Sequence, residues 1–326
     1  MSETADNGVE PIIFLDDVHV TFRTRTGSIL HPNLVHAVQG VTIKLMPGQT
    51  IGIVGESGCG KSTTANVMCG LQAPTSGKVY FKGKDVTKRT AEDRRHMGRV
   101  ISVVFQNPAT ALNPRMVVRE QLLDPMRVHN LGTEAEQEKR VKELLELTGL
   151  PSSAAEVLPG QLSGGQRQRV AIARALSLNP DAIIADEPTP GLDAQAAGRL
   201  LGHFRELAQE GAAVLFITHD LELALTVAHR VAVFYAGETI EEALAPDFEA
   251  GSLRHPFTQA LWDALPQRGF RPIPGSQPYP GEVGEGCPFL GQCPHPGADC
   301  AQGPLPLRPF QGGAVRCLYP NKEVAP

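Results

Sequence analysis

The sequence feature that most constrains this chain is a glycine-rich loop between a predicted strand and a predicted helix. The loop reads Gly55-Glu56-Ser57-Gly58-Cys59-Gly60-Lys61-Ser62 and follows the apolar run Ile51–Val54. Glycines allow successive backbone N–H groups to converge on an anion, and the positive end of the following helix adds to the field there. The pattern therefore predicts a phosphate-binding P-loop.

Two side chains at the end of this loop fit a nucleoside triphosphate. Lys61 is placed to reach the β- and γ-phosphates, and the Ser62 hydroxyl is placed to bind the accompanying Mg²⁺. We expect the loop and the adjoining Thr63 to form the phosphate site. The alternative, a purely structural glycine-rich turn, is disfavoured by the strand, loop and helix context.

The composition is ordinary for a soluble globular protein, with 326 residues of which 41% are hydrophobic and 20% charged. This length allows one large domain with an appendage, or two modest domains. The net charge of −5 argues against attraction of the whole molecule to nucleic acid or to an anionic membrane. Because no apolar run approaches the ~20 residues that span a bilayer, and Met1–Asp6 does not resemble a signal peptide, we expect a cytoplasmic location.

Strand-like runs precede the phosphate strand. Residues 11–22 and Val41–Leu45 predict antiparallel strands, and the polar, irregular stretch Arg23–His36 predicts a hairpin loop or an insertion between them. Phe22 ends the first run. Its position alone favours neither stacking on an adenine ring nor a place in the core.

A second strand end and a helical region follow the P-loop. The apolar run Val100–Phe105 is ended by Gln106, and a Gln at such a strand end is well placed to bind Mg²⁺ or to orient an attacking water. A lone Gln before a loop is usually solvent-facing, so the role rests on the wider pattern. Residues 116–149 are helical in character and predict a helical subdomain inserted between strands.

A second phosphate-facing element lies about a hundred residues after the P-loop. It reads Leu162-Ser163-Gly164-Gly165-Gln166 and leads into the helical run Arg167–Leu178. Ser163 and Gln166 have the spacing of a capping box, which a plain helix start would explain. Two consecutive glycines in the first turn weaken a helix but let a phosphate approach its positive end closely, so we favour phosphate binding.

Carboxylates and a histidine follow two further apolar strands. Asp181–Ala185 predicts a buried strand that ends in Asp186 and Glu187. The first carboxylate suits Mg²⁺, and the second can polarise water for attack on the γ-phosphate. The run Ala213–Thr218 presents His219, which could contact the γ-phosphate. An Asp-Glu pair in a solvated loop and an isolated histidine are commonly inert, but their places at strand ends favour the catalytic roles.

Four of the six cysteines crowd the C-terminus. From Gly269 onward Pro and Gly are dense and no helical or strand period persists, so a stable core needs a staple. In a reducing compartment four clustered thiolates favour Zn²⁺ or an iron–sulfur cluster over disulfides, and the absence of Cys-x-x-Cys pairs favours iron and sulfur. Unliganded cysteines in a disordered tail are the alternative, and Cys59 and Cys69 are expected to be bystanders. The candidate ligands are Cys287, Cys293, Cys300 and Cys317.

Taken together, these segments resemble the ATP-binding subunits of ABC transporters in order and approximate spacing. The matching segments are Gly55–Ser62, Gln106, Leu162–Gln166, Ile183–Glu187, Leu192-Asp193 and His219. Within that family, three further segments resemble the oligopeptide, dipeptide and nickel importer ATPases. These are Phe105-Gln106-Asn107-Pro108, Leu112-Asn113-Pro114-Arg115 and His255–Leu261.

The resemblance implies an α/β fold of the P-loop NTPase class, with a RecA-like parallel sheet core, an antiparallel β subdomain and an inserted helical subdomain. The ATP-binding domain would span residues 1–248, with the helical subdomain at about 107–178, and a small Cys-rich extension would span 249–326. The extension implies a [4Fe–4S] cluster on the four cysteines, with Zn²⁺ as the alternative, in a structural or regulatory role.

The resemblance also implies a head-to-tail dimer, in which ATP lies between the P-loop of one subunit and the Ser163 segment of the other. Lys61 and Ser62 would bind phosphate and Mg²⁺. Gln106 would sense the γ-phosphate and face the permease, and Asp186 would support Mg²⁺. Glu187 would be the catalytic base and His219 the γ-phosphate switch, with Phe22 in the adenine-stacking place. The nucleotide-binding positions implied are Phe22, residues 55–63, Gln106, Ser163, Gly164, Gly165, Gln166 and Asp193.

The chain departs from the family pattern twice. Pro190 and Gly191 stand where a small or hydroxylated residue and an Ala or Asp are more usual, and Pro159-Gly160-Gln161 stands where the family has Pro-His-Gln or Pro-His-Glu. The first departure puts a Pro-Gly turn beside the dimer contact, where communication between the two ATP sites would be altered. The second lies where contacts to the permease would shift.

The leading hypothesis is a peripheral motor on the cytoplasmic face of the membrane, driving a permease that an extracytoplasmic solute-binding protein supplies. The alternative is a soluble ABC ATPase of DNA repair or translation, but no tandem domain, coiled coil or basic tract is visible. A small-molecule kinase would leave Leu162–Gln166 unexplained. The solute (peptide, nickel, opine or another) stays open, as does the identity of the second ATP-binding subunit.

Overall fold

The computed structural model describes residues 9–28, 31–107, 111–273, 275–278 and 284–321. Pro108 and the Met1–Asp6 start, both used above, lie outside these residues. The chain forms two compact units. Unit 1 comprises Met1–Lys44, Ile51–Lys88 and Thr218–Pro326, and unit 2 comprises Leu45–Thr50 and Arg89–Ile217.

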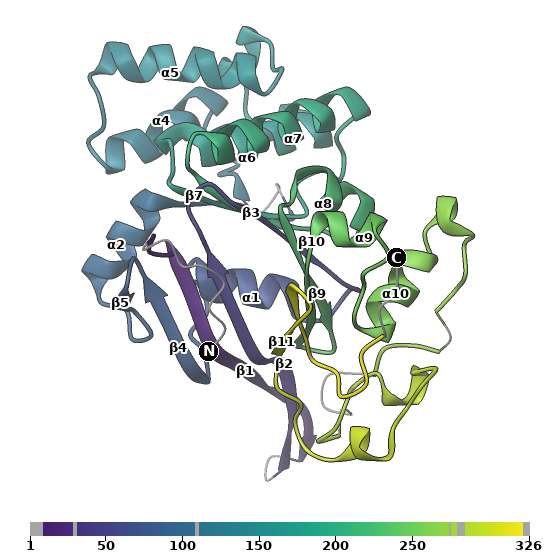
Figure 1. Ribbon diagram of the computed structural model, residues 1–326. Helices are drawn as coiled ribbons and strands as arrows, with labels where there is room; N and C mark the ends of the chain where they lie inside the picture. Colours follow the sequence, from purple (N-terminus) through teal and green to yellow (C-terminus); the bar gives the residue numbers. More distant parts are fainter. Residues whose placement is uncertain (1–8, 29–30, 108–110, 274, 279–283, 322–326) are drawn as a thin grey trace. The chain divides into compact units, whose positions relative to one another are not determined.

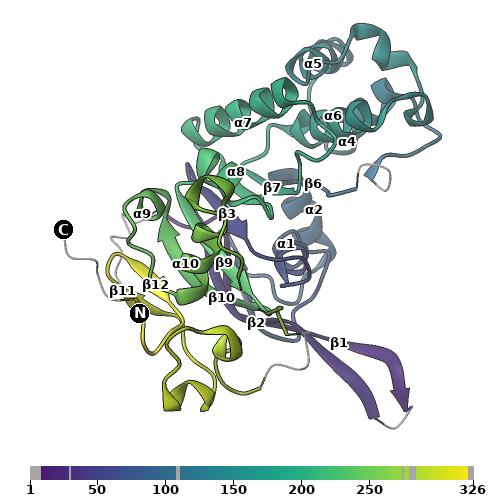
Figure 2. The same ribbon diagram turned by 90° about the vertical axis from the view of Figure 1, so that its right-hand side faces the viewer.

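Unit 1 contains an antiparallel sheet with the strand order β2-β1-β4-β5, whose first two strands form a long ribbon (Figures 1 and 2). The expected loop over Arg23–His36 is therefore wrong, because β1 continues to Ser28 and β2 begins at His31. The polarity of this stretch was misleading, because pairing between β1 and β2 outweighs the local polar pattern. The strands are β1 (Ile13–Ser28), β2 (His31–Leu45), β4 (Ser76–Phe81) and β5 (Lys84–Asp85).

A second set of strands in unit 1 runs in the order β11-β12-β10-β9-β3. The pair β3 and β9 is parallel, with Ile51 opposite Arg230, whereas β9, β10, β12 and β11 pair antiparallel. The strands are β3 (Thr50–Val54), β9 (Arg230–Tyr235), β10 (Glu238–Leu244), β11 (Arg308–Phe310) and β12 (Gly313–Val315). The helices are α1 (Lys61–Met68), α8 (Leu221–Val227), α9 (Ala245–Glu249) and α10 (Pro256–Asp263).

The C-terminal segment of unit 1, light green to yellow in Figure 1, contains β11, β12 and three 3₁₀ turns. The sequence indicates no strand period here, because three-residue strands are too short to show alternation. Two buried arginines hold this segment against the rest of unit 1 through hydrogen bonds. Arg254 donates from Nε to the Phe310 carbonyl at 2.9 Å, and Arg316 donates from Nε to the Thr239 carbonyl at 3.0 Å. The 3₁₀ turns are Pro266–Arg268, Leu290–Gln292 and Ala298–Ala301.

Unit 2 contains three parallel strands in the order β8-β7-β6, together with helices that Figure 1 shows in blue, teal and green. The helices expected over 116–149 are present as α4 and α5. The strands are β6 (Ile101–Val104), β7 (Ala182–Asp186) and β8 (Ala213–Ile217). The helices are α2 (Ala91–Val100), α4 (Val118–Val128), α5 (Glu134–Leu147), α6 (Gly164–Ala175) and α7 (Ala194–Gln209), with 3₁₀ turns at Ser152–Glu156, Pro159–Gln161 and Leu176–Leu178.

Each unit has its own apolar core. In unit 2 the rings of Phe204 on α7 and Phe216 on β8 meet edge to face, with centroids 6.2 Å apart. In unit 1 the rings of Tyr235, Phe257 and Phe289 form a mutual cluster, with centroids 4.5 to 5.6 Å apart. Burying such a ring contributes about 1.5–3 kcal/mol, so these clusters anchor the strands they lie on. Within the described residues, no helix has the length and apolar character needed to cross a membrane.

Candidate functional site

The P-loop in unit 1 connects the fully buried strand β3 to α1, as the sequence predicts. Three of its glycines have positive φ: +153° at Gly55, +84° at Gly58 and +102° at Gly60. A Cβ on Gly55 would lie 2.4 Å from the Phe234 carbonyl oxygen, and one on Gly60 would lie 2.3 Å from the Ala37 carbonyl oxygen. Only glycine fits at these two positions, because both the backbone angle and the space exclude a side chain.

Lys61 is the first residue of α1 and is 7% exposed. Its ammonium donates hydrogen bonds to the carbonyls of Gly55 at 2.6 Å and Glu56 at 2.8 Å. These bonds hold the cation across the loop, beside the positive end of α1. The side chain of the adjoining Ser62 is exposed. Burial raises the pKa of the Cys59 thiol, which agrees with the expectation that Cys59 is not a metal ligand.

His219 lies beside the strand that leads into the P-loop. Its predecessor Thr218 donates its backbone N–H to the Ile53 carbonyl at 3.1 Å, two residues before Gly55. The His219 side chain is exposed, and Asp220 after it caps α8 by accepting from the Leu223 N–H at 3.0 Å. Unit 1 therefore brings His219 to the same strand end as the P-loop.

Phe22, the expected adenine-stacking residue, lies on β1 in unit 1. Its side chain is 40% exposed, so it is not a core aromatic. An exposed ring on a strand is available to a planar ligand.

The two expected carboxylates of unit 2 follow one another at the end of β7. Asp186 is the last residue of β7 and is 9% exposed, and Glu187 is 7% exposed. Glu187 has φ of +48°, and its backbone N–H donates to the Ile217 carbonyl at 2.9 Å. A left-handed glutamate costs about 1–3 kcal/mol, and such residues cluster at functional sites. The bond to Ile217 holds the backbone in this conformation.

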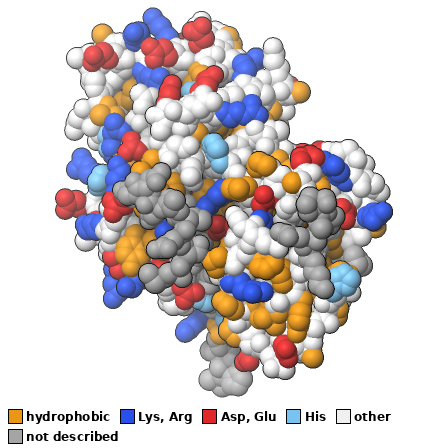
Figure 3. All heavy atoms as spheres, in the orientation of Figure 1, with side chains coloured by type: hydrophobic (Ala, Val, Ile, Leu, Met, Phe, Trp, Pro, Cys, Tyr) orange, Lys and Arg blue, Asp and Glu red, His pale blue; other side chains and the backbone are white. Residues whose placement is uncertain are grey.

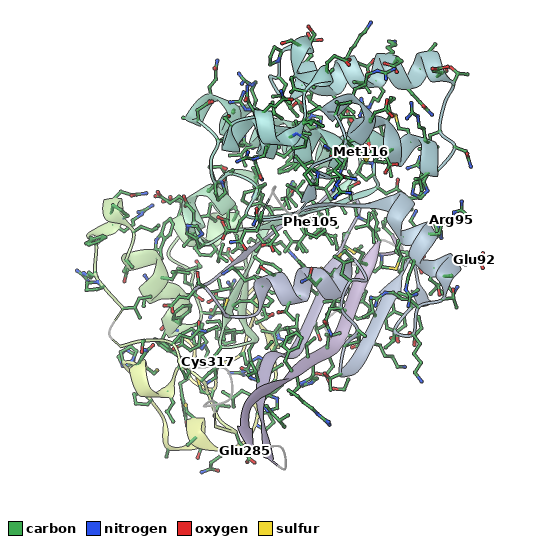
Figure 4. The ribbon with its side chains drawn as sticks, turned by 180° about the vertical axis from the view of Figure 1, so that it is seen from behind. Glu92, Arg95, Phe105, Met116, Glu285 and Cys317 are labelled. Carbon is green, nitrogen blue, oxygen red and sulfur yellow. The ribbon has the colours of Figure 1, made fainter. Side chains whose placement is uncertain are left out.

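Gln106 leaves the same edge of the unit 2 sheet. Strands β6 and β7 are parallel, with Val104 opposite Ala185, so their carboxyl ends point the same way. Figure 4 labels Phe105, the residue between β6 and Gln106. The Gln106 side chain is exposed. Unit 2 therefore places Gln106, Asp186 and Glu187 at one sheet edge, where open α/β sheets bind ligands.

The capping box expected at Ser163 is confirmed. Its Oγ accepts from the Gln166 N–H at 3.2 Å, and the Gln166 Oε1 accepts from the Ser163 N–H at 2.9 Å. Ser163 and Gly164 are exposed at the start of α6, and a Cβ on Gly164 would meet nothing within 4 Å. The N-terminus of a twelve-residue helix is thus open to an anion.

Asp193 caps α7 by accepting from the Ala196 N–H at 2.8 Å, and this bond, followed by Arg169, lowers the pKa of its carboxyl. Arg169 on α6 donates to the Asp193 carboxylate at 2.7 Å. The sequence analysis missed Arg169, because the partners are 24 residues apart and no local pattern indicates the pair. The structure therefore joins the Ser163 helix to the segment that carries Asp193.

The four C-terminal cysteines line one cavity in unit 1, which Cys317 in Figure 4 marks. The Cys287 N–H donates to the Cys300 carbonyl at 2.7 Å. Burial, and to a smaller extent the other three thiols, raise the pKa of Cys287 to about 11. All four cysteines that the sequence proposes as ligands therefore line the same cavity. His255, Phe289 and His295 also line this cavity.

No ligand set with metal-binding geometry is formed at this cavity. Among the described residues, no group of three or more His, Cys, Asp or Glu side chains is arranged to hold a metal ion. The cavity therefore contains four cysteines, but they are not arranged as metal ligands.

The exposed large apolar side chains of this part of the chain are Phe270, Leu318 and Tyr319. Figure 3 shows orange apolar side chains at the surface of unit 1.

Comparison with known proteins finds two family matches and close relatives over most of the chain. The ABC transporter family profile matches residues 38–190, and the profile for the oligopeptide/dipeptide transporter C-terminal region matches residues 242–300. The oligopeptide transport ATP-binding protein AppF of Bacillus subtilis (strain 168) is 40% identical over 296 residues, covering 87% of this chain and 90% of AppF. The dipeptide transport ATP-binding protein DppF of Escherichia coli (strain K12) is 33% identical over 324 residues, covering 97% of each.

Solved structures show the same fold. The dimeric, post-hydrolysis structure of the ATP-binding cassette MJ0796 bound to ADP and Pi has a TM-score of 0.66 and 32% sequence identity. The match covers 72% of this chain and 98% of that one. The expected P-loop α/β fold is therefore confirmed.

Proposed function

The chain belongs to the ATP-binding proteins of ABC transporters, in the oligopeptide/dipeptide transport group, and from this premise we propose that it powers the import of peptides through a membrane permease. It is an ATPase. The observation that carries the proposal is the similarity over nearly the whole chain to DppF, together with the matching C-terminal region. The alternative, a soluble ABC ATPase of DNA repair or translation, is not favoured, because the relatives are transport proteins.

In this proposal, different residues bind the phosphates, bind Mg²⁺ and activate the attacking water. Lys61 and the backbone of the P-loop hold the phosphates. The Ser62 hydroxyl, Asp186 and Gln106 are the residues that would hold Mg²⁺, which when bound would supply charge stabilisation at the phosphoryl group. Glu187 accepts the proton of the attacking water. The left-handed backbone of Glu187, held by the bond to Ile217, supports this role because it fixes the direction of the side chain.

Two further side chains complete the nucleotide site in this proposal. His219 contacts the γ-phosphate, which its place at the P-loop strand end supports. Phe22 stacks on the adenine, which the 40% exposure of its ring supports. Both come from unit 1, as does the P-loop.

The subunit would lie at the cytoplasmic face of the membrane and pair with permease subunits and a second ATP-binding subunit. A solute-binding protein would deliver the peptide. The test is growth of a peptide-requiring strain from which this gene has been deleted, complemented with wild type or with Lys61→Ala. We expect growth on peptides with wild type only. Equal growth with Lys61→Ala, or co-purification with DNA or ribosomes instead of a permease, would overturn the proposal.

We assign the open N-terminus of α6 to the ATP held by the partner subunit. Its support is the exposed Ser163, the unobstructed Gly164 and the dimeric form of the similar cassette. The test mixes Lys61→Ala subunits with Ser163→Arg subunits, because the mixed dimer then has one intact composite site. Activity above that of both parents is expected. Confirmed subunit exchange without any gain in activity would contradict the composite site.

The domain boundary near residue 248 and the extension over 249–326 remain part of the proposal, as does the helical subdomain at about 107–178. For the extension we further propose a [4Fe–4S] cluster on Cys287, Cys293, Cys300 and Cys317. Its support is that all four line one cavity. The cluster would supply four iron–thiolate bonds that staple a segment poor in regular structure.

Anaerobic purification tests the cluster. Brown protein with iron and acid-labile sulfide near four each per chain is expected, as the cluster type requires. Colourless protein with one Zn²⁺ would favour the zinc alternative. Metal-free protein with an ordered, protease-resistant C-terminal segment would rule out both.

A further inference from the structure

His255 is a buried histidine at the start of α10 to which neither the ATP site nor the proposed cluster ligands give a role. It is 1% exposed, and it opens the segment His255–Leu261, by which the chain resembles peptide importer ATPases. Its Nδ1 accepts the Phe257 N–H at 3.0 Å and so caps the helix. Because Nδ1 is an acceptor, the ring proton lies on Nε2.

Further contacts fix the place of this ring. The His255 backbone N–H donates to Glu241 Oε2 at 2.8 Å, and the Arg254 N–H donates to Oε1 of the same carboxylate at 2.8 Å. The Phe289 ring packs on the imidazole, with centroids 5.9 Å apart and an interplanar angle of 56°. The backbone and one ring nitrogen are thus committed, and the Nε2–H is the polar group of this side chain that is left to pair.

The Nε2–H is buried and unpaired. Among the residues that the structure describes, none forms a hydrogen bond with His255 Nε2. Native folds rarely leave a buried donor in this state, because it has lost its hydrogen bonds to water without replacement. His255 lines the cavity of the four cysteines, so we look for the missing acceptor there.

The side chains of the cavity indicate what the acceptor is. Cys300 and Cys317 are buried, whereas His295 and Tyr319, which also line it, are exposed. The sulfur of a thiol is a weak acceptor, but a thiolate or sulfide sulfur carries negative charge and accepts strongly. An unpaired N–H in a cavity lined by four cysteines therefore fits anionic sulfur bound in that cavity.

This requirement agrees with the donor set of an iron–sulfur cluster better than with that of a single metal ion. Each thiolate of a [4Fe–4S] cluster binds a different iron, so the four sulfurs need not converge on one point as they do around Zn²⁺. The cysteines line one cavity without forming a site for a single ion among the described residues.

We propose that His255 donates its Nε2–H to a sulfur of the [4Fe–4S] cluster and thereby raises the reduction potential of that cluster. The inference rests on the cluster proposed for this cavity. Hydrogen bonds to the sulfurs are among the features that set such potentials. The bond stabilises negative charge on sulfur, and an added electron increases that charge. The reduced form therefore gains more from His255 than the oxidised form does.

The test compares wild type, His255→Asn, His255→Gln and the control His295→Asn as full chains, purified without oxygen and loaded with ferrous iron and sulfide. In His255→Asn the amide oxygen keeps an acceptor for the Phe257 N–H, but the Nε2–H is lost. In His255→Gln the amide nitrogen lies as many bonds from the backbone as Nε2 does, so the donor is kept and the cap is lost. At the exposed His295, water can donate in place of the ring.

Each cluster is titrated with dithionite, which supplies one electron, and followed by electron paramagnetic resonance. We expect His255→Asn to shift the reduction equilibrium about tenfold towards the oxidised form, which lowers the potential by ~59 mV. His255→Gln should have a potential between those of wild type and His255→Asn, with a midpoint of thermal unfolding about 2–4 °C lower because the cap is lost. His295→Asn should keep the wild-type potential.

Equal potentials in wild type and His255→Asn would overturn the hydrogen bond and leave the cluster in place. An equal fall in His295→Asn would also overturn it, because the effect would then not be specific to His255. Wild type that takes up no iron would overturn the proposed cluster and this inference together. If neither variant at 255 takes up the cluster, reduced wild type labelled with ¹⁵N-histidine decides the question. Pulsed paramagnetic resonance should detect a coupled ring nitrogen that persists in His295→Asn, and the lack of any coupled histidine nitrogen would contradict the proposal.

Discussion

The P-loop and the four-cysteine cavity both belong to unit 1, but the chain builds them in opposite ways. The P-loop is eight consecutive residues whose shape comes from the backbone. A Cβ on Gly55 or Gly60 would lie within 2.4 Å of a backbone carbonyl oxygen, so neither position can carry a side chain. The cavity gathers Cys287 to Cys317 from three short segments, which turns and two buried arginines hold. The first region is therefore encoded locally, and the second exists only after the chain has folded.

The two regions share one hairpin, which joins β9 to β10. On one side, the Gly237 N–H donates to the Cys59 carbonyl of the P-loop at 3.1 Å. On the other side, Tyr235 packs on Phe289 and donates from its hydroxyl to the Gln292 Oε1 at 2.9 Å. Because the two regions are built differently, we expect substitutions in the P-loop to affect nucleotide binding and substitutions at the cavity to affect the stability of the fold.

The largest expected loss of stability is in Arg316→Met. Arg316 faces Glu238 at 3.7 Å and donates to the carbonyls of Thr239, Leu305 and Gly40. Burial raises the pKa of Glu238, so its charge depends on the arginine. Breaking such a buried pair costs about 3–5 kcal/mol. Chemical denaturation should show this loss, and limited proteolysis should cut first in the C-terminal segment. A variant as stable as wild type would show that Arg316 does not hold the C-terminal segment in place.

Next in size is Gly60→Ala, which should act on ATP binding. The left-handed angle and the overlap with the Ala37 carbonyl together cost about 2–5 kcal/mol. Binding of ATP, measured by calorimetry, should weaken by up to about 30- to 5 × 10³-fold. Gly98→Ala is the matched control, since a Cβ there meets nothing within 4 Å and should leave binding unchanged. Equal losses of ATP affinity in the two variants would show that the backbone shape of the P-loop at Gly60 does not determine ATP binding.

A smaller effect is expected for the paired substitution Cys287→Ser and Cys300→Ser. A hydroxyl in place of the buried Cys300 thiol costs about 1–3 kcal/mol, the half-buried Cys287 adds less, and loss of the proposed cluster would add to both. The midpoint of thermal unfolding should fall by several degrees, while ATP affinity stays within twofold. A large loss of affinity would show that the cavity takes part in nucleotide binding.

The smallest expected effect is that of Tyr235→Phe, which removes only the hydroxyl that bonds Gln292. The loss should be about 1 kcal/mol, measured by denaturant unfolding, because the ring packing remains. ATP affinity should not change. A change in affinity without a change in stability would reveal coupling between the regions through this hairpin.

The sequence could predict the features that depend on neighbouring residues along the chain, but not those that form only when distant segments pack together. The P-loop, the capping box at Ser163 and the strand ends at Asp186 and His219 were readable, because each depends on neighbours along the chain. The ribbon through residues 23–28 was not, since pairing between strands overrode its polar pattern. The pair of Arg169 with Asp193 and the contact of Gly165 with Gly191 were also not readable. They join residues more than twenty positions apart, so only the packing of α6 reveals them.

The most direct test of the account is Glu187→Gln, measured as ATP turnover together with ATP binding and subunit association. We predict that turnover falls by the ~10²–10⁴-fold expected for loss of a general base. ATP binding should persist, and light scattering should show an ATP-dependent dimer that does not dissociate. Wild-type turnover in this variant would contradict the assignment of Glu187 and, with it, the proposed mechanism of hydrolysis.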